Sequence, residues 1–214
     1  MKPSYQISIA LADDHVLLRN GVAELINSGN KGMHVIIQAS DGAELVSALE
    51  TTGMLPDVCV IDVNMPIMNG YQTVQIIHER WPFIKILAMS MYNHEYAIID
   101  MMRKGACGYI EKGGEPDELF NAIQWAYNHG YYHNELTGKH ASRMNDVPEL
   151  KERELELLAH CCSDITYNEI ATKMNLSLRA VEDYRQRIFT KLHIKSRAGL
   201  VVFAMKIGLV PEKA

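Results

Sequence analysis

Five short apolar runs, separated by amphipathic segments, most constrain the fold of this chain. The runs are continuously hydrophobic rather than alternating, and they occupy residues 7–11, 34–39, 58–61, 85–89 and 108–110. Strands buried on both faces of a parallel sheet have this character. The segments between them show helical spacing of apolar residues, over 15–27, 42–51, 70–81, 95–104 and 116–129. The pattern predicts an α/β fold, a doubly wound five-stranded parallel sheet with its site at the carboxyl ends of the strands.

Charge divides the chain into an acidic front and a locally basic end. The 214 residues carry a net charge of −5, made up of −7 over residues 1–148 and +2 over 149–214. Such an asymmetry predicts two domains with different partners. We expect a first domain, a polar linker and a small all-α second domain, over residues 1–129, 130–147 and 148–214.

Composition argues against a membrane or secreted protein. No apolar run approaches the ~20 residues that a membrane-spanning helix needs, and acidic residues follow the start too closely for a secretory signal. The cysteines show no metal-binding spacing, which fits reduced thiols. We therefore expect a cytoplasmic protein without membrane contact.

Polar side chains follow four of the predicted strands. Asp13 and Asp14 follow the first strand, Asp62 ends the third, Ser90 ends the fourth and Lys112 follows the fifth. Because the carboxyl ends of parallel strands meet at one edge, these side chains should converge. Three carboxylates in one place repel one another, and a divalent cation relieves that repulsion. Oxygen ligands that leave room for waters suit Mg²⁺.

A hydroxyl and an ammonium beside such a site suit a phosphoryl group. Lys112 would balance its charge and Ser90 would donate a hydrogen bond. Asp62, next to a metal, can then act as the nucleophile that forms an aspartyl-phosphate. Each residue alone has a simpler interpretation, since a lone Asp at a strand end caps a turn. Together, however, these residues lie at the same ends of their strands, which favours a phosphoryl-transfer site over separate structural roles.

The segments LADDH, VIDVNMPIMNG, LAMS and GACGYIEK resemble the receiver domain of two-component response regulators, over residues 5–129. The resemblance implies that Asp62 is the phosphoacceptor. It implies Mg²⁺ held by Asp13, Asp14, Asp62 and the backbone carbonyl of Asn64. It also implies a pairing of Lys112 with the phosphoryl group, a switch hydroxyl at Ser90 and a switch aromatic residue at Tyr109.

Two further positions follow from this resemblance. Gly113 stands after Lys112, where many receivers have a proline, so the backbone geometry at that point is open. In receivers, the side chains two positions after the acceptor and two after the switch hydroxyl border the path of the hydrolytic water. Here these are Asn64 and Tyr92.

The end of the chain shows helical periodicity. An amphipathic helix is predicted over LKERELELLAHCC, and Thr166 and Glu169 form a capping box for the next helix. Ser177 caps a longer helix that runs to about Leu192, and Ser196 caps a last one. Two helices joined by a tight turn, the second with a polar outer face, indicate a helix-turn-helix. From periodicity alone, a plain four-helix domain with solvated charges remains open.

This region resembles the LuxR-type DNA-binding domain over residues 148–211, although Lys151 and Ala180 stand where threonines are usual. A receiver followed by this domain is typical of NarL/FixJ-type response regulators. The resemblance places Glu182, Asp183 and Gln186 toward base edges. It places Arg179, Arg185, Arg187, Lys195 and Arg197 nearer to phosphates.

The sequence therefore predicts a phosphorylation-controlled transcription factor rather than an enzyme. Its expected partners are a sensor histidine kinase, double-stranded DNA and, on activation, a second copy of the chain. Two alternatives remain open. A Mg²⁺-dependent phosphohydrolase would need a general acid two residues after Asp62, where Asn64 stands. A protein-docking module would make no specific contact with DNA.

Overall fold

The computed structural model describes residues 6–29, 31–141, 143 and 146–209. Contacts divide the chain into two compact units, Met1–Met144 and Asn145–Ala214. The first unit carries the sheet, and the regular elements described in the second unit are all helices. None of the described helices is long and apolar enough to cross a membrane.

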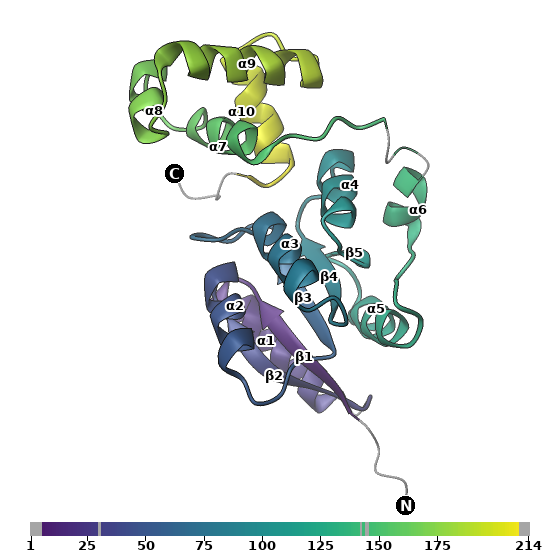
Figure 1. Cartoon of the computed structure of the whole chain (residues 1–214). Coiled ribbons are helices and arrows are strands. Elements are labelled where there is room, and N and C mark those ends of the chain that lie inside the picture. Colours follow the sequence, from purple (N-terminus) through teal and green to yellow (C-terminus); the bar gives the residue numbers. More distant parts are fainter. Residues whose placement is uncertain (1–5, 30, 142, 144–145, 210–214) are drawn as a thin grey trace, which may run out of the picture. The chain divides into compact units, whose positions relative to one another are not determined.

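Within the described residues, five parallel strands form the sheet of the first unit (Figure 1). They are β1 (Ile7–Ala12), β2 (Met33–Ala39), β3 (Val58–Asp62), β4 (Lys85–Ser90) and β5 (Gly108–Glu111). Their order is β2-β1-β3-β4-β5, so the chain reverses its direction of winding after β2. The predicted doubly wound parallel sheet is confirmed.

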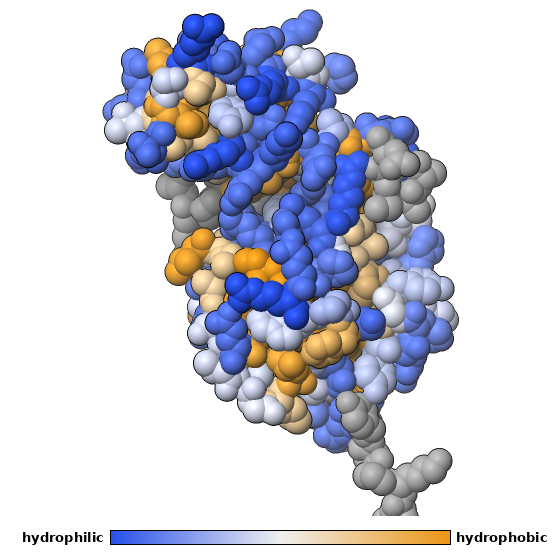
Figure 2. Space-filling model, in the orientation of Figure 1, coloured by the Kyte–Doolittle hydropathy of each residue, from blue (hydrophilic) through white to orange (hydrophobic). Residues whose placement is uncertain are grey.

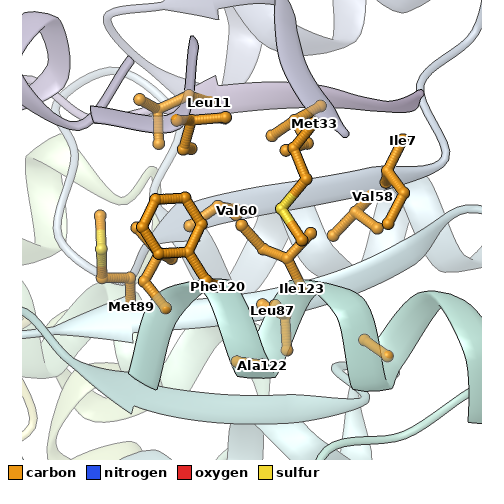
Figure 3. Packing of buried hydrophobic residues seen from close by; sticks show 14 of the residues in the cluster. Ile7, Leu11, Met33, Val58, Val60, Leu87, Met89, Phe120, Ala122 and Ile123 are labelled. Atoms are coloured by element: carbon orange, nitrogen blue, oxygen red, sulfur yellow. The ribbon is translucent and has the colours of Figure 1, made fainter. Parts of the chain in front are cut away.

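Helices connect the strands and cover both faces of the sheet. They are α1 (Val16–Ser28), α2 (Gly42–Thr51), α3 (Gly70–Arg80), α4 (Glu95–Arg103) and α5 (Pro116–His129). Figure 3 shows Phe120 and Ile123 of α5 turned toward strand side chains such as Val60. Helix α1 adds Ile26 to the same core. Burying each such side chain contributes about 1.5–3 kcal/mol, which fixes α1 and α5 on this face of the sheet.

A helix that the sequence did not predict follows α5, within the stretch expected to be a linker. This helix, α6 (Glu135–Ala141), packs against α4 and β5. Just before it, the Asn134 amide donates to the carbonyl oxygen of Tyr109 at 2.9 Å and to the Glu118 carboxylate at 3.0 Å. The Tyr132 N–H donates to the carbonyl of Cys107 at 2.7 Å. The segment therefore covers β5, which is one of the two edge strands of the sheet.

The second unit is built from α7 (Glu152–His160), α8 (Tyr167–Lys173), α9 (Leu178–Leu192) and α10 (Arg197–Lys206). Each helix gives fully buried apolar side chains to one core, among them Leu157, Ile170, Val181, Ile188 and Leu200. The side chains predicted as caps all accept backbone N–H groups: Thr166 from Glu169, Ser177 from Ala180 and Ser196 from Gly199.

The N-terminus of α7 is stabilised differently from those of the other three helices, without a bond from its N-cap side chain. Lys151 occupies its N-cap position, where a threonine is usual in the LuxR-type domain, and a lysine side chain cannot accept a hydrogen bond. Instead the buried Glu154 carboxylate accepts the Lys151 backbone N–H at 2.8 Å. The same carboxylate pairs with Lys191 of α9 at 2.6 Å. Glu154 therefore joins the first turn of α7 to the longest helix of the unit.

Candidate metal centre and nucleic-acid interface

The predicted cluster of charged residues lies at the carboxyl ends of β1, β3 and β5. Lys112 Nζ lies 2.7 Å from Asp62 Oδ2 and 2.9 Å from Asp13 Oδ2. All three side chains are almost fully buried, with at most 3% of their surface exposed. One ammonium thus bridges two carboxylates that come from different strands.

Burial and neighbouring charges shift the pKa of Asp62, and likewise that of Lys112, in opposite directions. Burial raises the pKa of Asp62 to about 6, because it disfavours the charged carboxylate, while Lys112 opposes the increase. Burial would lower the pKa of Lys112, but the charges of Asp62 and Asp13 outweigh it and the pKa is raised. The lysine therefore remains an ammonium. One positive charge cannot balance all the carboxylates at this edge.

The remaining donors fit a divalent cation. Ligand atoms of Asp13, Asp14, His15 and Asp62 all lie within 4.8 Å of one another. Asp14 and His15 are partly exposed, with 32% and 57% of their side-chain surfaces open, so the cluster is reached from solvent. Carboxylate oxygens at a solvent-accessible edge match the ligands of Mg²⁺, which keeps several waters when it binds a protein.

The turn after β3 is held in one shape. The Gly70 N–H donates to the carbonyl of Val63 at 2.9 Å, and the Asn69 side chain caps α3 by accepting from Gln72. A Cβ atom added to Gly70 would lie 2.3 Å from the carbonyl oxygen of Asp62, so only glycine fits there. The Asn64 N–H donates to Asp62 Oδ1 at 3.2 Å. These bonds fix the backbone of Asn64 beside the carboxylates.

The hydroxyl and the aromatic residue predicted as a switch lie in one hydrogen-bonded group. Ser90, at the end of β4, is 1% exposed, and its Oγ accepts the Tyr92 N–H at 3.0 Å. The fully buried Tyr109 of β5 donates its hydroxyl to the carbonyl oxygen of Tyr92. Burial raises the pKa of Tyr109, which keeps this donor protonated. The loop between β4 and α4 is thus fixed to both residues.

Gly113 does not prevent Lys112 from reaching the cluster. No cis peptide bond occurs in the part of the chain that the structure describes. A Cβ atom added to Gly113 would meet no atom within 4 Å. The Lys112 backbone N–H donates to the carbonyl of Ser90 at 2.9 Å, which anchors the chain directly before the glycine.

In the second unit, α9 presents a polar face to solvent (Figure 2). Glu182, Asp183 and Gln186 are exposed on it, as are Arg179 and Arg187. The apolar residues of the helix face the core, with Val181 and Ile188 fully buried. Lys195 is exposed in the turn that follows. The helical spacing of apolar residues in the sequence predicted this division into a polar outer face and an apolar inner face.

The two remaining predicted phosphate contacts, Arg185 and Arg197, lie partly inside the unit. The Arg185 guanidinium stacks over the Tyr167 ring at 4.8 Å. The Arg197 guanidinium donates to the carbonyl oxygens of Cys161, Ser163 and Ile165, at 3.0, 2.7 and 2.7 Å. Arg197 therefore closes the turn between α7 and α8. The sequence offered no signal for this, because the three carbonyls lie more than thirty residues before the arginine.

Two family models match the chain, one in each unit. Residues 9–124 match the model of the response regulator receiver domain. Residues 148–204 match the model of the luxR family of bacterial regulatory proteins. The chain is a response regulator. It combines a receiver domain with a LuxR-type helix-turn-helix domain, as DNA-binding regulators of two-component systems do, and it does not belong to an enzyme family.

Two relatives belong to the same family, and a solved structure shares the fold. The oxygen regulatory protein NreC of Staphylococcus carnosus is 33% identical over 218 residues, covering 95% of this chain and 99% of that protein. The response regulator UvrY of Escherichia coli K12 is 30% identical, covering 95% of each chain. The structure of RcsB from Salmonella enterica serovar Typhimurium, bound to a promoter in the presence of a phosphomimetic, has a TM-score of 0.71 at 20% identity. It covers 94% of this chain and 99% of that one.

Proposed function

We propose that Asp62 accepts a phosphoryl group from a sensor histidine kinase in the cytoplasm and thereby controls transcription through the second unit. The observation that carries the proposal is the buried Lys112 ammonium between Asp62 and Asp13. Membership of the response regulators supports it. In this proposal residues 1–129 are the receiver domain, 130–147 the linker and 148–214 the DNA-binding domain.

The residues of the cluster would divide the chemistry among them. Asp13, Asp14, Asp62 and the backbone carbonyl of Asn64 would hold Mg²⁺, which supplies positive charge to the phosphoryl oxygens. The Asp62 carboxylate attacks phosphorus while the bond from phosphorus to the donor histidine breaks. Lys112 holds Asp62 in place beforehand and pairs with a phosphoryl oxygen afterwards. Ser90 donates its hydroxyl to another of these oxygens.

Phosphorylation would favour a homodimer that binds double-stranded DNA. Ser90 and Tyr109 are both linked to the loop before α4, so a new bond to Ser90 changes the contacts of that loop. Two recognition helices related by a twofold axis can enter successive major grooves. We propose that this geometry is favoured when the receivers pair.

The outer face of α9 supplies the proposed contacts with DNA. Glu182 and Asp183 can accept from cytosine N4, and Gln186 can pair with adenine. The phosphate contacts we propose are Arg179, Arg185, Arg187 and Lys195, with Arg197 holding the turn that supports the helix. Exposure of Arg179, Arg187 and Lys195 supports their part in this division.

Acetyl phosphate tests the phosphoacceptor directly. The parent protein should acquire one phosphoryl group in the presence of Mg²⁺, seen as a shifted band on Phos-tag gels, and EDTA should prevent the shift. Asp62→Asn should remain unshifted. Asp117→Asn, at an exposed site on α5, is the matched control and should be labelled like the parent. Full labelling of Asp62→Asn would overturn the assignment.

Selection from random DNA, followed by gel shifts, tests the second unit. Glu182→Ala should lose discrimination at one base pair, worth about 1–3 kcal/mol, whereas Arg179→Ala should weaken all sequences alike and lower the salt slope by about one. Equal losses on selected and random duplexes for both variants would contradict this docking. Absence of any selected sequence would favour the protein-docking module.

A further inference from the structure

We propose that His15 is an additional ligand of the cation site and gives it affinity for a borderline divalent transition metal, of the Co²⁺, Ni²⁺ and Zn²⁺ class, above that of a site made of oxygen ligands alone. The inference rests on the proposed cation site at Asp13, Asp14 and Asp62. It concerns which cation the site selects, and the receiver chemistry does not require it.

The placement of His15 is the first observation. His15 occupies the N-cap position of α1, where Ser, Thr, Asp or Asn normally accepts a backbone N–H of the first turn. Its side chain makes no such bond. The imidazole turns to the carboxylates instead, with Nδ1 2.9 Å from Asp14 Oδ1 and 3.2 Å from Asp13 Oδ1.

These distances are those of ligands around one ion. Two donors that each lie about 2.0–2.2 Å from a common cation, at roughly right angles, are about 3 Å apart. The separations of His15 Nδ1 from the two carboxylate oxygens match that value. The Asp62 ligand atom lies within 4.8 Å of the other three. A cation could therefore be held with little movement of the side chains.

The chemistry of the donors sets the selectivity. Imidazole suits Co²⁺, Ni²⁺ and Zn²⁺, while carboxylates, carbonyls and water suit Mg²⁺. A histidine beside the acidic residues therefore adds affinity for transition metals and almost none for Mg²⁺. More than half of the His15 side-chain surface is exposed, so the ring can reach an ion together with its waters.

The same distances also fit a simpler role, in which His15 only donates a hydrogen bond to a carboxylate. His15→Gln separates the two roles, because an amide still donates a hydrogen bond but is a poor ligand for Co²⁺. His78→Gln, which removes an exposed imidazole from the last turn of α3, is the matched control. The probes are CoCl₂ and MgCl₂ added to metal-stripped full-length protein.

Calorimetric titration gives the affinities, and pulsed EPR of bound Cu²⁺, a transition-metal ion that imidazole suits, detects coupling to an imidazole nitrogen. We expect His15→Gln to lower the ratio of Co²⁺ to Mg²⁺ affinity by about tenfold or more and to abolish the nitrogen coupling, with His78→Gln like the parent. An unchanged ratio and no nitrogen coupling in the parent would overturn the role of His15. Asp14→Asn should weaken both metals, and Mg²⁺ affinity unaffected by that change would instead overturn the proposed cation site.

Discussion

Lys112 Nζ lies 2.7 Å from Asp62 Oδ2, and its other contact, Asp13 Oδ2, is 2.9 Å away. The lysine comes from the end of β5 and the aspartate from the end of β3, with β4 between them in the sheet. The pair therefore exists only in the folded receiver domain. Because both side chains are buried, its protonation is coupled to stability.

The first prediction concerns pH in the presence of EDTA. The pKa of Asp62 is raised to about 6 by burial, so the folded state holds a proton that the unfolded state has already lost near pH 4. The contribution of the Asp62 carboxyl group to the free energy of unfolding is fully present below about pH 4 and is lost as the pH rises through about 6. The side chain of Asp62→Asn cannot titrate. As the pH rises through that window, the free energy of unfolding of this variant should therefore increase relative to that of the parent, by about 2–3 kcal/mol at pH 8.

Urea unfolding followed by tryptophan fluorescence measures this difference, because both tryptophans, Trp81 and Trp125, lie in the first unit. Asp117→Asn is the control, since its side chain is 80% exposed. A difference between Asp62→Asn and the parent that is the same at pH 4 and pH 8 would contradict the coupling.

Much of the fold was predictable from the sequence, for a physical reason. Continuous apolar runs such as VCVI are typical of strands that are buried on both faces of a parallel sheet covered by helices. Their alternation with helical segments therefore predicted a doubly wound sheet. Helix α6 was not predicted, because ELTGKHA has little apolar periodicity and includes a glycine. Its contacts with α4 and β5, and the bonds of Asn134, sustain it. Tertiary contacts of this kind override local propensity.

The convergence of Asp13, Asp62 and Lys112 was predictable from strand ends alone, because parallel strands deliver their last residues to one edge. The orientation of His15 was not, since it depends on which way one ring turns at a helix N-cap. The hydrogen bonds of Arg197 within the second unit were not predictable either. The charge of an arginine does not show whether its guanidinium binds backbone carbonyls or is free to contact DNA phosphates.

Asn134 gives the second prediction. Its amide donates to Tyr109 and Glu118, and its Oδ1 accepts the Thr137 N–H at the start of α6. Asn134→Ala leaves these partners without their bonds and should lower the free energy of unfolding of the receiver by about 1–3 kcal/mol. Urea unfolding with tryptophan fluorescence is the measurement. Asn128→Ala, at an exposed site on α5, should change it by less than about 0.5 kcal/mol.

The third prediction separates Arg197 from Lys195. Arg197→Ala removes three hydrogen bonds to backbone carbonyls and should speed hydrogen exchange in α7 and α8, in line with a loss of about 2 kcal/mol. Lys195 is exposed, and Lys195→Ala should leave exchange unchanged while weakening DNA binding at low salt. Hydrogen-exchange mass spectrometry of the full chain, with gel shifts in parallel, gives both readouts. Normal exchange in Arg197→Ala would contradict the structural role.

The fourth prediction concerns the lifetime of the aspartyl-phosphate on Asp62, which depends on a water approaching in line, opposite the carboxylate oxygen. Tyr92 borders that approach by its position two residues after Ser90, and the structure leaves its side chain partly exposed. Its backbone N–H and carbonyl are held by Ser90 Oγ and by the Tyr109 hydroxyl, which keeps the residue next to Ser90. A ring in this place should crowd out the water. Asn64, the other bordering residue, is neutral and is a poor base.

We therefore expect slow self-dephosphorylation of the parent and faster decay in Tyr92→Ala. Tyr92→Phe keeps the ring and removes the hydroxyl, so it should decay like the parent if the ring shields the bond. The measurement is loss of labelled phosphoprotein after the donor is removed, at fixed Mg²⁺. Faster decay in Tyr92→Ala alone assigns shielding to the ring, whereas slower decay in both variants would mean that the hydroxyl positions the attacking water. An alanine variant that decays at the parent's rate would remove Tyr92 from the path altogether.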